Sequence, residues 1–236
     1  MRGIVLTKLT VLLLNAAVVI AGSLIGSNLK KVIRKDVLDG VMIGIGVVTV
    51  FIGATGVSTD TNVLTLLIAY SVGCFIGYSL DLQGKLDSAS QSIEKRFSTG
   101  ENKIIGPGIS FFIISCSGAF TINACFFAGM GDFSLLYTKI SMDFIVSITL
   151  SSALGIGVLF SIVPITLFQG ALILLSGVLS PLMTPVMIRA FASAGSLVAV
   201  LVGTNLIGIT KIKIINFIPC IFLAPFAAML TERLAQ

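Results

Sequence analysis

The stretch SFFIISCSGAFTINACFFAGMGDFSLLYTKISMDFIVSITLSSALGIG, residues 110–157, decides the fold class of this chain of 236 residues. It contains two apolar segments, each long enough to cross the hydrocarbon core of a bilayer as a helix. Polar groups are costly in hydrocarbon, so a cluster of them indicates a functional site or contacts between helices. The polar residues of the first segment are Ser115, Ser117, Thr121 and Asn123, and those of the second are Lys139, Asp143, Ser147, Thr149, Ser151 and Ser152.

The composition is that of an integral membrane protein. The chain is 56% hydrophobic and only 11% charged, whereas a soluble domain has about 25% charged residues. Long apolar runs recur from one end to the other, which is the signal of transmembrane helices. We therefore expect an all-α integral membrane protein that forms a single transmembrane domain over residues 1–236. The eight expected spans are residues 9–29, 37–57, 63–80, 108–129, 139–163, 165–183, 186–209 and 212–230, with the boundary between the fifth and the sixth near Pro164.

The charged residues predict the orientation in the membrane. The net charge is +5, and the basic residues lie mainly in the loops between apolar spans, so topology explains them better than nucleic-acid binding does. Five basic residues fall on one side of the eight spans and ten on the other, and the richer side should be cytoplasmic. Both termini are then predicted to lie outside. The four cysteines are isolated and there is no histidine, so we expect no metal site, no disulfide and no cofactor.

Residues 81–104 form the only long polar segment. Leu82, Leu86, Ala89, Ile93 and Phe97 recur at helical spacing, with polar residues between them. This pattern favours an amphipathic helix that lies in the membrane interface. A solvated linker helix is the alternative, because only one apolar stripe is present.

The chain resembles itself at an offset of 155 residues. Gly22 then meets Gly177, and Thr49 meets Thr204, with no gap needed across residues 22–55. The offset advances the chain by five spans, an odd number, so spans one to three (residues 9–80) and six to eight (residues 165–232) are predicted to form an inverted repeat around two central spans (residues 105–163). Inverted repeats are typical of secondary transporters, whose sites lie at the repeat interface near the midplane.

Several motifs resemble those of a known family. They are SGAFT (117–121), AGMGD (128–132), KISMD (139–143), LGIG (154–157) and NFIP (216–219), and Asn15, Gly22 and Gly26 look like the family's opening. This family is that of the YqgA/YdfK-like bacterial multi-pass membrane proteins, which share a domain of unknown function (number five hundred and fifty-four). The resemblance covers essentially the whole chain and implies the bacterial cytoplasmic (inner) membrane, without a substrate or a reaction. The family tends to carry an acidic residue where this chain has Ala128. A carboxylate at this position is therefore not expected to be essential here.

Lys139 and Asp143 are the most informative candidates, because their i, i+4 spacing puts them on one helix face. The functional interpretation is that Asp143 binds a cation or carries a proton, while Lys139 sets its charge state. The alternative is an ion pair at the membrane boundary whose lysine reaches the interface. The other polar residues either line a substrate path or form hydrogen bonds between helices. The full set of predicted solute- or ion-binding residues is Asp143, Lys139, Asn123, Thr121, Ser117, Ser115, Ser147, Ser151 and Asn15.

The predicted function is ion-coupled secondary transport of a small solute or ion. A channel and a non-transport membrane scaffold remain as alternatives. An enzyme is not expected, because the chain has no histidine, no paired carboxylates at catalytic spacing and no phosphate-binding loop. The expected partners are the lipid bilayer and an unidentified small solute or ion, without nucleic acid, and a homo-oligomer is left open.

Overall fold

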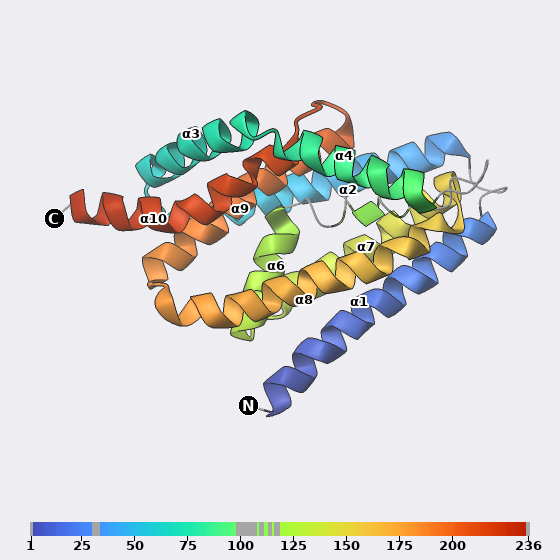
Figure 1. The fold of residues 1–236 in the computed structure, drawn as a ribbon, viewed down its shortest axis with the longest axis horizontal. Coiled ribbons are helices and arrows are strands. Elements are labelled where there is room, and N and C mark those ends of the chain that lie inside the picture. The colour runs from blue at the N-terminus through green and yellow to red at the C-terminus, as the bar shows by residue number, and fades with distance from the viewer. Residues whose placement is uncertain are drawn as a thin grey trace.

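The computed structural model describes residues 2–29, 34–97, 108, 111–112, 115 and 119–234. The described residues form helices joined by turns, with no strand among them, so the expected all-α class is confirmed for this part of the chain. Figure 1 shows α1, α7 and α8 running along one side of the molecule and α2, α3, α9 and α10 along the other. The elements are α1 (Arg2–Leu29), α2 (Lys35–Thr55), α3 (Val63–Ser79), α4 (Leu82–Phe97), α6 (Ala119–Met130), α7 (Ser134–Leu154), η1 (Ile156–Ser161), α8 (Ile162–Leu179), η2 (Ser180–Leu182), α9 (Pro185–Ile207), η3 (Ile214–Phe217) and α10 (Ile218–Leu234).

Five of the described helical segments are long and apolar enough to cross a membrane. They are residues 7–29, 36–55, 156–182, 185–207 and 214–234. A sixth candidate is the pair formed by α3 and the start of α4, which bends by 42°. By length and composition the described helices therefore support five or six spans, and the eight that were expected are not confirmed.

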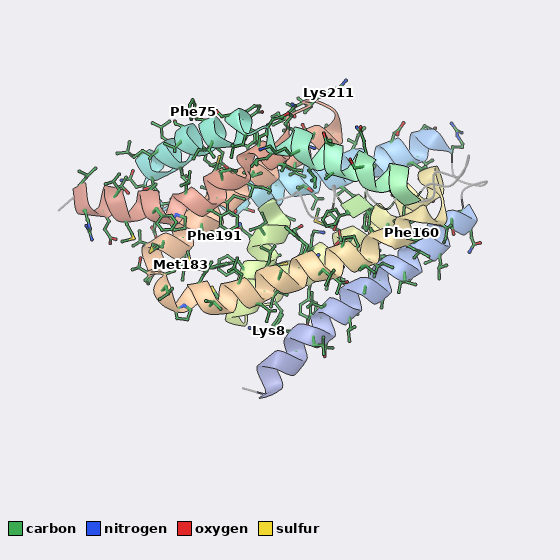
Figure 2. The ribbon with its side chains drawn as sticks, viewed as in Figure 1. Lys8, Phe75, Phe160, Met183, Phe191 and Lys211 are labelled. Carbon is green, nitrogen blue, oxygen red and sulfur yellow. The ribbon has the colours of Figure 1, made fainter. Side chains whose placement is uncertain are left out.

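The outer surface of the bundle is apolar, as a lipid environment requires. Phe75 and Phe160 are 75% and 56% exposed and project away from the helices, whereas Phe191 is 2% exposed and lies inside (Figure 2). Exposed apolar side chains occur along α1, α2, α3 and α8. In a soluble protein so much exposed apolar surface would favour aggregation, and in a bilayer it contacts acyl chains.

The break after α7 lies at Gly155 and not near Pro164, so the expected boundary between the fifth and sixth spans is wrong. Gly155 has φ = 93°, a conformation that a residue with a Cβ rarely adopts, and α7 ends at Leu154. Pro164 instead lies in the first turn of α8, where the missing N–H leaves no helical hydrogen bond unmade. The proline was a poor boundary signal because helices accept it at this position.

Helices α2 and α9 pack against each other through backbone atoms. A Cβ built at Gly46 would lie 2.9 Å from the carbonyl oxygen of Gly203, and a Cβ at Gly53 would lie 2.7 Å from that of Ser196. The residue numbers rise along one helix as they fall along the other, so the pair is antiparallel. Glycine at these positions allows the close approach that small residues give membrane helices.

The amphipathic segment forms a helix, α4, as its spacing predicted. Its first turn is joined to the α9–α10 connection, because the side chain of Asn216 accepts a hydrogen bond of 2.8 Å from the backbone N–H of Gln83. An exposed ion pair of 3.0 Å joins Lys213 and Asp81 beside it. Whether α4 lies in the membrane interface stays a prediction.

Candidate functional site

Helix α7 carries Lys139 and Asp143 into the centre of the bundle. Because α7 begins at Ser134, Asp143 lies about 13 Å along the helix axis at 1.5 Å per residue, which is near the middle of the helix and deeper than the sequence-based span placed it. Lys139 is 5% exposed and Asp143 is 3% exposed. Both charged side chains are therefore enclosed by the protein.

The two charged side chains form an ion pair together with Ser115. The Nζ atom of Lys139 contacts Oδ1 of Asp143 and donates a hydrogen bond of 2.9 Å to the hydroxyl of Ser115. That hydroxyl in turn donates to Oδ1 of Asp143 over 3.0 Å. The second carboxylate oxygen, Oδ2, is buried and has no hydrogen-bond partner among the described residues. Burial of a charge pair is costly, so a carboxylate with one free oxygen indicates a functional role more than a stabilising one.

A small pocket, here named the inner cavity, lies beside the ion pair. Its volume is about 40 Å³, more than the 10–15 Å³ or so that one water molecule needs. Thr121 lines it and fixes the entry into α6, because its hydroxyl donates a hydrogen bond of 2.5 Å to the carbonyl oxygen of Ser115. The lining residues are Ile45, Thr49, Ser115, Thr121, Lys139, Met142, Asp143, Val146, Val202 and Leu206.

A second space, here named the outer cavity, holds Asn123. Its volume is about 250 Å³. The outer cavity lies about one helical turn from the inner cavity along the α2–α9 pair, because Thr49 lines the inner cavity and Ile52 lines the outer one. The lining residues are Ile52, Gly53, Gly56, Asn123, Phe127, Asp132, Leu135, Ala192, Ser196 and Ala199.

Three of the predicted site residues line neither cavity: Ser151 and Asn15 form hydrogen bonds between helices, and Ser147 forms one within α7. The hydroxyl of Ser147 donates to the carbonyl oxygen of Phe144 over 2.8 Å, and that of Ser151 donates to the carbonyl oxygen of Ser23 over 2.7 Å. Both serines lie where α7 packs on α1. Asn15 lies where α1 packs on α8. Ser117 is outside the described residues.

The structure thus brings four predicted residues together, Ser115, Thr121, Lys139 and Asp143, and places Asn123 in a separate cavity. Sequence analysis missed Thr49 and Ser196 as lining residues. The 155-residue offset pairs Thr49 with Thr204, so the repeat could have marked Thr49 as a residue of interest. No comparable signal marked Ser196.

The fold and the buried ion pair define a helical membrane protein with a polar centre, and comparison with known proteins gives its family. The family described as "Protein of unknown function (DUF554)" matches residues 10–229, so the chain belongs to this family. The chain is 25% identical over 229 residues to "Uncharacterized protein YqgA" of Escherichia coli (strain K12), covering 94% of this chain and 97% of that protein. It is 24% identical over 217 residues to "Uncharacterized membrane protein YdfK" of Bacillus subtilis (strain 168), covering 89% of this chain and 92% of the relative. No solved structure matches the chain significantly.

Proposed function

We propose that the protein is an ion-coupled secondary transporter of a small solute or ion in the bacterial cytoplasmic membrane. The observation that carries the proposal is Asp143, which is buried at the middle of α7, lines the inner cavity and has no hydrogen-bond partner for Oδ2 in the part of the chain that the structure describes. An ionisable side chain at this depth is rare unless it binds or moves a charge. We do not expect enzymatic activity.

The chemistry follows from the two oxygens of Asp143. Lys139 and Ser115 occupy Oδ1, which leaves Oδ2 for a proton or a monovalent cation. Binding of that charge weakens the attraction between Lys139 and the carboxylate, because the carboxylate is then neutralised from its other side. A change in the ion pair is thereby linked to occupancy of the cavity, which is what coupling requires.

The proposal includes the inverted repeat. Shifted by 155 residues, α3 covers residues 218–234, which are the bounds of α10. The matching helices also pair with each other: a Cβ at Gly73 of α3 would lie 2.6 Å from the Cα of Cys220 of α10. Antiparallel contact between equivalent helices is expected of two halves related by a two-fold axis in the membrane plane, and it supports an eight-span architecture with α6 and α7 at the centre.

The orientation with both termini outside is also part of the proposal. Lys8 near the start of α1 donates a hydrogen bond of 2.7 Å to the carbonyl oxygen of Gly129, so the N-terminal end of α1 lies beside the α6–α7 turn. Arg34, Lys211 and Lys213 belong to connections at the opposite ends of the helices, and Lys85 lies in the first turn of α4 beside the α9–α10 connection. An excess of basic residues marks the cytoplasmic side.

Charge movement in proteoliposomes on a solid-supported membrane tests the function. We expect a transient current with at least one ion or small metabolite in a screen, and we expect Asp143→Asn to abolish it while the protein stays folded. Ser147→Ala is the control, because Ser147 lies on the same helix but bonds within it. Currents that Asp143→Asn leaves intact would disprove the role of Asp143. Steady single-channel steps would favour a channel, and the absence of any current would favour electroneutral exchange or a scaffold.

A further inference from the structure

The outer cavity is preformed, and one polar group in its lining has no hydrogen-bond partner among the described residues. Two helices line it with backbone and small side chains, α2 and its C-cap through Gly53 and Gly56 and α9 through Ala192 and Ala199. Its volume of about 250 Å³ is several times the ~30 Å³ that one water molecule occupies in the liquid. This space suits a small organic molecule.

Asn123 is the unsatisfied group. Its Nδ2 donates a hydrogen bond of 3.0 Å to the carbonyl oxygen of Ala192. That bond fixes the orientation of the amide, because the flipped form would set oxygen against oxygen. The amide oxygen Oδ1 is then buried with no hydrogen-bond partner among the described residues. Asn123 as a whole is only 4% exposed. Buried acceptors are rarely left unpaired, so a donor from outside the chain is expected here.

The electrostatic character of the outer cavity favours a positive ligand. No lysine or arginine is among the described residues that line it, whereas Asp132 contributes a carboxylate at the α6–α7 turn. The backbone N–H of Ser134 donates a hydrogen bond of 3.0 Å to Asp132. That hydrogen bond lowers the pKa of Asp132, so the carboxylate stays charged at neutral pH. The ring of Phe127 supplies an aromatic surface, which attracts cations.

A bare metal ion fits the outer cavity poorly. Calcium takes six to eight oxygen ligands at about 2.3–2.6 Å, and magnesium needs a near-octahedral set. The outer cavity offers one carboxylate, one amide oxygen and the hydroxyl of Ser196 within a much larger space. The described residues also contain no group of three or more His, Cys, Asp or Glu side chains able to hold a metal.

We propose that the outer cavity binds a small organic cation through its primary ammonium group, which donates a hydrogen bond to Oδ1 of Asn123 while Asp132 attracts it from the α6–α7 turn. This inference deepens the proposed transport function, and it rests on that function only where the bound cation is taken to be the transported solute. The aliphatic part of the ligand contacts Phe127, Leu135 and Ile52. Hydrogen bonding by the amide oxygen selects an N–H donor over a quaternary ammonium group, which has none.

Isothermal titration calorimetry on the full chain in lipid nanodiscs tests the site at equilibrium, without transport. The probe is propylammonium, compared with propionamide and propionate, which have a similar size and a neutral or negative head group. We expect saturable binding of propylammonium only. Asn123→Leu should weaken it at least tenfold. Asp132→Asn retains the oxygen that accepts from Ser134 but removes the charge, so it should weaken binding several-fold and reduce its dependence on salt.

Thr231→Val is the control, because Thr231 bonds to Thr65 between α3 and α10, away from both cavities. It should bind propylammonium as the unmodified protein does. Binding of propionate as tight as that of propylammonium would overturn the proposal, as would unchanged binding in Asp132→Asn, a surface variant that folds even if Asn123→Leu does not. Propylammonium binding without an Asp143-dependent current would support the cation site and disprove the proposed transport function. Asp143-dependent currents without propylammonium binding would support transport and disprove the cation site.

Discussion

Asn15 of α1 donates a hydrogen bond of 2.9 Å to the side-chain oxygen of Gln169 of α8, and the two residues are only 2% and 1% exposed. The remaining amide atoms, Oδ1 of Asn15 and Nε2 of Gln169, are buried without partners among the described residues. Each side chain therefore has one satisfied and one unsatisfied group. The pair joins two helices that the 155-residue offset treats as equivalent.

We expect Asn15→Leu to destabilise the protein by about 1–3 kcal/mol, because it leaves the amide of Gln169 with no partner at all. The double variant Asn15→Leu, Gln169→Leu should be less destabilised than the sum of the single variants, because both polar groups are then gone. Unfolding by sodium dodecyl sulfate, monitored by circular dichroism, measures the difference. Strictly additive effects would show that the two amides are not coupled.

The ion pair allows a similar test with larger effects. Lys139→Met removes the partner of a buried carboxylate, and loss of one partner of a buried pair costs about 3–5 kcal/mol. Lys139→Met combined with Asp143→Leu removes both charges and should recover much of that stability while giving no transport current. The same unfolding assay, with currents recorded in parallel, checks both statements. Full stability of Lys139→Met alone would contradict the buried pair.

The α2–α9 contact predicts opposite effects for two alanine substitutions. At Gly203 a Cβ would lie 2.7 Å from the carbonyl oxygen of Gly46, so Gly203→Ala must force the helices apart and destabilise the protein. At Gly44, on the same helix as Gly46, a Cβ would meet nothing within 4 Å. Gly44→Ala should therefore be neutral or more stable by up to about 1 kcal/mol, since glycine is a poor helix former. Thermal unfolding in detergent compares the two, and equal effects would argue against the backbone contact.

The inverted topology predicts that equivalent connections face opposite sides of the membrane. Arg34 precedes α2 with an 80% exposed side chain, and Leu182, which is 74% exposed, precedes α9. In a cysteine-free background, Leu182→Cys should react with a membrane-impermeant thiol reagent in intact cells. Arg34→Cys should react only after the cells are permeabilised. Labelling of both from the same side would disprove the inverted arrangement.

The sequence predicted the helical class and the Lys139–Asp143 pair, because both depend on local pattern: apolar run length and i, i+4 spacing. It could not predict the contact with Ser115, which lies 24 residues before Lys139 and depends on how two helices pack. It also grouped Thr121 with Asn123, which line different cavities. Two residues apart on a helix means a rotation of about 200°, so these side chains point in nearly opposite directions.

Periodicity along α7 likewise failed to separate the site from the packing surface. Ser147 lies one turn beyond Asp143, so sequence spacing placed it with the site. In the structure a Cβ at Gly22 of α1 would lie 2.9 Å from the carbonyl oxygen of Phe144, which shows how closely α1 covers this part of α7. Only the position of α1 excludes Ser147 from the inner cavity, and no local pattern encodes that position.

The backbone contact between α2 and α9 also limits how the protein can move. At Gly46, Gly53 and Gly203 the two helices approach through main-chain atoms, with few side-chain atoms between them that could change rotamer, so we expect the pair to move as one body. A motion that opens the inner cavity must then shift α7 against this body. If the protein transports as proposed, a covalent crosslink between α2 and α9 should leave turnover intact, and one between α2 and α7 should stop it.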